Sequence, residues 1–147
     1  MTHNEFIDIV EQVKKSKPIL FELERDRIIS ENDITCLEAA NGVVLPNEYK
    51  LFVLEFGGGY FGFVKIYSLD ADSSLYLMAN QNVVPDGYLA ISDNECGDYY
   101  ILKNNSGIID SRVLFFEHES QQIVETNYEN IYEYLVVEGL RYQLNGK

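Results

Sequence analysis

Residues 45–60 read LPNEYKLFVLEFGGGY, and this stretch decides the fold. Pro46 suits the first turn of a helix, where its missing N–H is not needed. The large side chains recur at spacings of three and four residues and so share one helix face: Tyr49, Phe52, Val53 and Phe56. The glycines at 57–59 can adopt the positive φ that ends a helix and lets the chain turn into a strand. The stretch therefore predicts a core-facing helix over 46–56.

Two further helices are predicted upstream, each opened by a capping box. In such a box a hydroxyl and an acidic side chain three residues later satisfy each other's backbone N–H groups. Thr2 and Glu5 form the first, followed by an apolar face of Phe6, Ile9, Val10 and Val13. Ser30 and Asp33 form the second, which should end at Gly42. Its inward side chains are predicted to be Ile34, Leu37 and Ala40.

From residue 60 onward, β-branched and aromatic runs between turn residues indicate antiparallel strands. They are predicted over 60–68, 75–80, 88–92, 98–103, 113–117 and 122–125. A third capping-box pattern, Thr126 with Glu129, predicts a final helix with Ile131, Tyr134, Leu135 and Val136 inward. The fold class is α+β: N-terminal helices, a central bent antiparallel sheet of five to six strands, and a C-terminal helix.

Length and composition place the chain among ordinary globular proteins. The 147 residues are 46% apolar, which supports one domain over 1–147 with a core of its own. Cys36 and Cys96 are too few for a disulfide framework and fit no zinc pattern, so a reducing cytoplasm is the expected location. We expect Cys36 to be buried in its helix and Cys96 to be an exposed loop thiol. No apolar run has the length of a membrane span or a signal peptide, so a soluble protein is expected.

A formal net charge of −13 restricts the possible partners. Residues 1–50 carry 6 basic and 10 acidic side chains, whereas residues 51–147 carry 5 and 14. Nucleic acids and anionic membranes are bound through lysine and arginine, so neither is expected as a ligand. The acidity alone could equally serve solubility.

The order of these motifs resembles the SUKH superfamily. The resemblance extends from about residue 30 to 140 and rests on LPNEYKLFVLEFGGGYF, IYSL and PDGYLAISDNECGDYYIL, followed by a strand pair and the last helix. Within the superfamily, which includes a yeast cell-wall-assembly regulator, the chain looks most like small bacterial immunity proteins of Bacillus-type toxin systems. The resemblance implies a SUKH-like fold and an immunity protein that neutralises a cognate polymorphic toxin, commonly a nuclease, in the cytoplasm. An intracellular adaptor or regulator on the same scaffold is the alternative.

Charge and tyrosine content agree with a protein partner. Many nuclease toxins have a basic cleft for phosphates, which an acidic protein could occupy as a nuclease inhibitor. The 11 tyrosines are amphipathic, and tyrosine is enriched at interface hot spots. The predicted interface acids are Asp70, Asp72, Asp86, Asp93, Glu95 and Asp98, then Glu117 and Glu119. The predicted aromatic companions are Tyr67, Tyr88 and Tyr99, for each of which core packing is an equal alternative.

No enzyme site, metal site or cofactor is predicted. Asp93 and Asn94 lack the alternating oxygen ligands of a calcium loop, and turn formation explains them better. His118 could be imagined as a general base, but no nucleophile accompanies it, so a solvent-facing histidine is favoured. Gly57 to Gly59 follow a helix, which is the reverse of a phosphate-binding loop.

Overall fold

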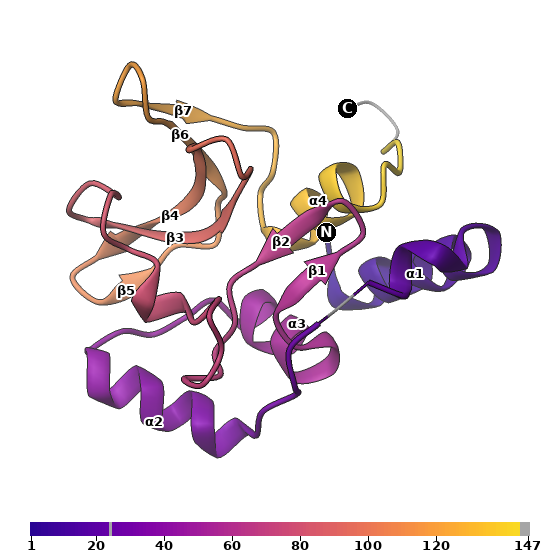
Figure 1. Ribbon diagram of the computed structural model, residues 1–147, viewed down its shortest axis with the longest axis horizontal. Coiled ribbons are helices and arrows are strands. Elements are labelled where there is room, and N and C mark those ends of the chain that lie inside the picture. Colours follow the sequence, from indigo (N-terminus) through magenta and orange to yellow (C-terminus); the bar gives the residue numbers. More distant parts are fainter. Residues whose placement is uncertain (24, 145–147) are drawn as a thin grey trace.

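Helices at both ends of the chain flank a seven-stranded antiparallel sheet in the computed structural model, which describes residues 1–23 and 25–144 (Figure 1). The N-terminal helices are α1 (His3–Ser16), a 3-10 turn (Pro18–Phe21), α2 (Glu31–Asn41) and α3 (Asn47–Phe56). At the other end, α4 (Ile131–Tyr134) continues into a π-helical turn over Leu135–Gly139. The predicted α+β class is confirmed. No helix in the described ranges is long and apolar enough to cross a bilayer.

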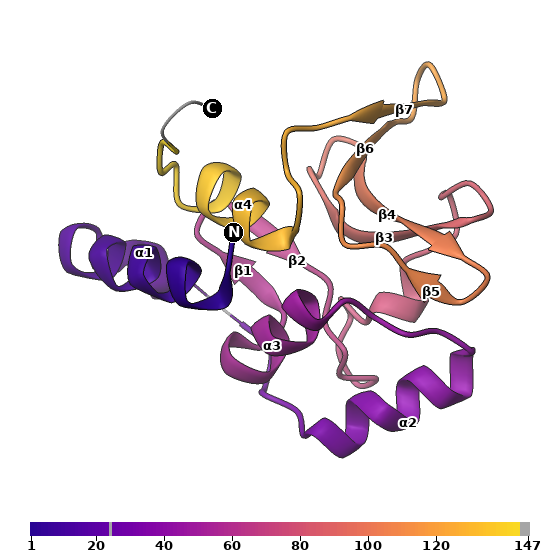
Figure 2. The ribbon, with the colours of Figure 1, turned by 180° about the vertical axis from the view of Figure 1, so that it is seen from behind.

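The sheet has the order β1-β2-β3-β4-β6-β7, with β5 paired to β4. Its strands are β1 (Gly59–Phe61), β2 (Val64–Ile66), β3 (Tyr88–Asp93), β4 (Tyr99–Asn105), β5 (Ile108–Ile109), β6 (Leu114–Glu117) and β7 (Gln122–Glu125). A register shift between Ala90 and Ser92 marks a bulge, and bulges bend strands. In Figures 1 and 2 the β6–β7 hairpin lies at the top and α2 at the bottom, with β3 and β4 between them.

An aromatic cluster joins α1, α3 and β1, as the 45–60 stretch predicts. The predicted inward residues of α3 are all buried: Tyr49, Phe52, Val53 and Phe56. The ring of Phe52 lies 5.3 Å from Phe56 and 5.2 Å from Phe61, and Phe6 of α1 contacts all three. Pro46 immediately precedes α3, and Gly57 ends it with φ +72°. The two N-terminal capping boxes are both formed.

Two predicted strands are wrong. Residues 60–68 form the β1–β2 hairpin instead of one strand, because Gly62 turns the chain with φ +60°. A Cβ at Gly62 would overlap the carbonyl oxygen of Gly139, so the turn is packed against the C-terminal helix. Residues 75–80 contain a 3-10 turn over Leu77–Ala79. Side-chain bonds such as Asn80 Nδ2 to the Tyr76 carbonyl, at 2.6 Å, hold that turn and replace strand pairing.

Three predictions about the helices also need correction. Ala40 and Cys36 are exposed, because α2 buries only Ile34 and Leu37 against the core. The last helix is capped by Asn130, whose side chain accepts the N–H of Tyr132. Thr126 instead donates its hydroxyl to the carbonyl of Val113 and accepts the N–H of Tyr128. Asn130, four positions later, is thus the N-cap that the sequence pattern predicted at Thr126.

Candidate protein-binding surface

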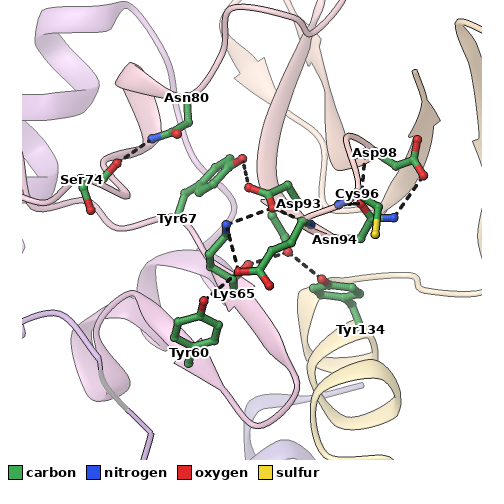
Figure 3. Close-up of polar contacts among 12 residues, drawn as sticks. Tyr60, Lys65, Tyr67, Ser74, Asn80, Asp93, Asn94, Cys96, Asp98 and Tyr134 are labelled. Carbon is green, nitrogen blue, oxygen red and sulfur yellow. Dashed lines mark hydrogen bonds and ion pairs between the residues drawn. The ribbon is translucent and has the colours of Figure 1, made fainter. Parts of the chain in front are cut away.

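The β3–β4 turn carries three of the predicted interface acids, and local side-chain bonds shape it. Asp93 accepts the N–H of Glu95 at 2.9 Å, and Asn94 accepts the N–H groups of Cys96 and Asp98 at 2.9 and 3.1 Å (Figure 3). Glu95 has a positive φ of +63°. These bonds confirm the turn-forming roles predicted for Asp93 and Asn94.

Asp98 ties this turn to the β6–β7 turn. Its Oδ1 accepts the backbone N–H of His118 at 3.0 Å and lies 2.7 Å from Nδ1 of the same residue. The ring of His118 rests above Gly97, where a Cβ would meet it at 3.0 Å. The bond from His118 lowers the pKa of Asp98, and Asp98 in turn raises the pKa of His118. His118 is exposed, as predicted, but it is paired with a carboxylate.

A second network lies behind the turn, between β1, β2 and β3 (Figure 3). Lys65 Nζ lies 3.0 Å from Asp93 Oδ1 and 3.6 Å from Glu95 Oε1. Tyr67 donates its hydroxyl to Asp93 at 2.7 Å, and Tyr60 donates to Glu95 at 2.7 Å. Burial alone would raise the pKa of Asp93, but the bonds from Tyr67 and Lys65 outweigh it and lower that pKa. Asp93 is therefore held as a carboxylate whose charge Lys65 offsets.

The structure brings together those predicted site residues that lie at the β3–β4 turn end of the sheet: Asp93, Glu95, Asp98, Tyr99, Glu117 and Glu119. Tyr99 pairs with Asp93 on one side and with Phe116 on the other. Within residues 1–23 and 25–144, Glu117 and Glu119 form no side-chain hydrogen bond or ion pair. We call these six residues the acidic end of the sheet. Tyr67 supports it from the core, where only 1% of its surface is exposed.

The remaining predicted residues lie elsewhere. Asp70 is buried and accepts two bonds from Arg27, at 2.7 and 3.0 Å, beside α2. Asp72 is exposed, 3.8 Å from the same guanidinium. Asp86 and Tyr88 lie at the start of β3, the end opposite to Asp93, and Tyr88 is half-buried. Asp70 therefore has a structural partner, whereas Asp72 and Asp86 are separate surface acids.

The sequence patterns did not predict a groove that lies between the sheet and the C-terminal segment. The groove has a volume of about 370 Å³. Its sheet wall includes Tyr100, Phe115 and Val124, and its other wall includes Tyr128, Val137 and Tyr142. Antiparallel register could have placed the three sheet residues on one face, but the position of the helix opposite them depends on tertiary packing.

The chemistry of the described residues is that of a binding surface. Across residues 1–23 and 25–144, no group of three or more histidine, cysteine or acidic side chains is placed to hold a metal ion. Cys36 and Cys96 are both free thiols. Exposed carboxylates beside Tyr99 and an open apolar groove can contact a cationic protein surface through charge and ring burial.

Comparison with known proteins gives one family and one fold. The family model SUKH_6, described as SMI1-KNR4 cell-wall, matches residues 31–135. No curated protein matches the chain significantly. A crystal structure of a protein from Pseudomonas syringae pv. tomato superposes with a TM-score of 0.68 at 18% identity, covering 92% of this chain and 98% of that one. At this identity the similarity concerns the fold alone.

Proposed function

The chain belongs to the SMI1-KNR4 (SUKH) family, and we propose from this that it is an immunity protein that neutralises a cognate toxin domain. Proteins of this family are generally immunity or regulatory proteins, and the family is associated with protein partners. The proposed toxin is a nuclease, and neutralisation takes place in the cytoplasm of the producing cell.

The observation that carries the proposal is the acidic end of the sheet. Glu117 and Glu119 project from the β6–β7 turn, and Glu95 is 57% exposed on the neighbouring turn. A nuclease must attract phosphates with basic side chains, so its active-site cleft is complementary to such a surface. Charge complementarity accelerates association by about 10 to 10³-fold, which favours capture of a toxin before it acts.

The proposal predicts that a large secreted protein with a nuclease-like carboxyl-terminal domain is encoded directly upstream. The test is co-expression of the chain with that domain. Cells producing both proteins should survive, and the two should co-purify as a complex. A variant with Glu95, Glu117 and Glu119 changed to glutamine should fold normally, yet bind more weakly. A matched control changes the exposed Glu22, Glu31 and Asp8 to their amides, which removes the same charge from the helical part. Killing that persists despite soluble immunity protein would contradict the proposal.

A further inference from the structure

One row of side chains crosses four strands, and its exposure to solvent increases from β3 to β7. The register aligns Ser92, Tyr100, Phe115 and Val124 on the same sheet face. Ser92 is fully buried against α4, where its hydroxyl lies 2.7 Å from that of Tyr134. Val124, at the far end, is 45% exposed. The C-terminal helix thus covers this face at β3 and leaves it open at β7.

The open part of the row forms the apolar groove. The ring of Tyr100, which lines the groove, is tilted by 42° against the ring of Tyr134, with centroids 4.4 Å apart. Burial raises the pKa of Tyr100 to about 12, and the nearby charge of Glu138 acts in the same direction. Tyr128 and Val137 face the sheet from the opposite wall. The groove can accept an apolar side chain, because it is lined with rings and aliphatic groups from Tyr100, Phe115, Val124 and Val137.

Strand β7 borders this groove and ends the sheet. It pairs with β6 on one side, and within the described residues no strand pairs with its outer side. All four of its side chains are exposed. An outer strand of this kind presents unpaired N–H and C=O groups, which are a template for another extended chain. Backbone pairing there and a side-chain pocket beside it are the two components of recognition by strand addition.

The charge of the residues around β7 determines which extended segment can pair with this strand. Residues 113–140 contain six glutamates and neither lysine nor arginine, and the nearby Arg112 is engaged by the carbonyl of Thr126, to which it donates at 3.0 Å. Glu119 lies in the turn before β7, Glu125 ends the strand, and Glu129 follows it, all exposed. Two copies of this protein would each bring a formal net charge of −13 to the contact, so repulsion disfavours a second copy as the occupant. A segment rich in lysine or arginine gains from every one of these glutamates.

We propose that β7 receives an extended basic segment of the toxin domain as an additional strand, with one apolar side chain in the groove beside Val124. This inference rests on the proposed function and specifies how the partner is held. Side chains of a strand alternate between faces, so one residue in two of the segment would face the groove and its neighbours would face solvent.

The experiment measures binding of the toxin domain that the proposed function predicts to the full chain and to paired variants. Val124→Asp places a carboxylate in the apolar wall of the groove, and Glu125→Lys reverses the charge beside it. Val83→Asp and Glu22→Lys are matched controls, because Val83 is 57% exposed in the loop before β3 and Glu22 is exposed near α1. We expect Kd to rise at least about tenfold for the first two variants and by less than about twofold for the controls. Amide exchange at residues 122–125 should slow at least about tenfold in the complex.

The outcomes separate this inference from the proposed function. If the wild-type chain binds and protects but the β7 variants behave like their controls, strand addition is wrong and immunity stands. Unchanged amide exchange at residues 122–125 in the complex would also overturn it. A concentration-dependent dimer that Val124→Asp dissolves would show that β7 serves self-association instead. Failure of the wild-type chain to bind the toxin domain would remove both proposals.

Discussion

A single carboxylate oxygen of Asp98 holds His118 twice, at 2.7 Å through ring Nδ1 and at 3.0 Å through the backbone nitrogen. The two residues belong to different turns, 20 positions apart in the chain. Their contact fixes the β3–β4 turn against the β6–β7 turn and so keeps the acidic end together. A Cβ at Gly97 would meet this ring at 3.0 Å, so the ring would have to shift by a few tenths of an ångström, and the φ of +97° disfavours any other residue there.

This pair should give the fold a defined pH dependence. The pKa of His118 is raised above 6.5, so its stabilising effect is complete below that pH and is lost as pH rises through the raised value. The pKa of Asp98 is lowered below 3.8, so its effect is present above that pH and is lost as pH falls through the lowered value. The pair therefore stabilises most between about pH 3.8 and 6.5. In an NMR titration, Asp98→Asn should move the pKa of His118 down; an unchanged value would show that the contact is absent in solution.

The aromatic cluster should dominate stability. Phe52 is 1% exposed among three other phenylalanine rings, so Phe52→Ala should lower the free energy of unfolding by about 3–5 kcal/mol. Leu51 is the neighbouring control on the same helix, since it is 42% exposed. Leu51→Ala should change that free energy by less than about 1 kcal/mol. Urea unfolding followed by circular dichroism measures both, and similar losses would place Phe52 outside the core.

Two glycines with positive φ should respond differently to alanine. Gly62 and Gly87 have φ of +60° and +87°, so a side chain strains both by about 1–2 kcal/mol. Only at Gly62 would the added Cβ also meet backbone, at the Gly139 carbonyl; at Gly87 nothing lies within 4 Å. Gly62→Ala should thus be destabilised further, by about 1–3 kcal/mol beyond Gly87→Ala. Equal midpoints in thermal unfolding would argue against close packing of the β1–β2 turn on the C-terminal helix.

Asp70 should matter for folding more than for binding. Its carboxylate receives both bonds from Arg27 and also the N–H of Asp72 at 3.1 Å. Asp70→Asn should lower the melting temperature while leaving toxin affinity unchanged at a temperature where the protein stays folded. Asp72→Asn is the exposed control and should leave the melting temperature nearly unchanged. A selective loss of affinity in Asp70→Asn would return this residue to the binding surface.

Association with the toxin should depend strongly on salt. Screening shortens from about 10 Å at 0.1 M salt to about 3 Å at 1 M, so charge-steered encounter slows over that range. Changing Glu117 and Glu119 to glutamine should flatten the dependence of kon, measured by stopped flow. Changing Glu22 and Glu31 should not, because they lie away from the sheet. A salt-independent kon would remove charge steering while leaving immunity intact.

Local patterns predicted the elements whose causes are local. The capping boxes at Thr2 and Ser30, and the turn at Asp93 and Asn94, are formed as expected because each depends on residues within a few positions. Thr126 shows the limit: its hydroxyl finds the carbonyl of Val113, 13 residues away, and the cap passes to Asn130. Competition from tertiary partners is not encoded in the spacing of a motif.

In the candidate site, too, the features with local causes could be predicted from the sequence. Strand pairing brings Asp93, Asp98 and Glu117 to one end of the sheet, and alternation along hairpins anticipates much of that arrangement. Asp70 was assigned to the surface because its partner, Arg27, lies 43 residues away in the chain. The groove depends on where the C-terminal helix stops covering the sheet, which is a property of packing between distant segments.

The exposure of β7 has a consequence for specificity. All four side chains of the strand project from the surface, and the core continues without them. Substitutions there can alter which chain is recognised while leaving the free energy of folding almost unchanged. Under the proposed function, substitutions at Gln122–Glu125 can change which toxin is bound while the scaffold that presents these residues stays the same.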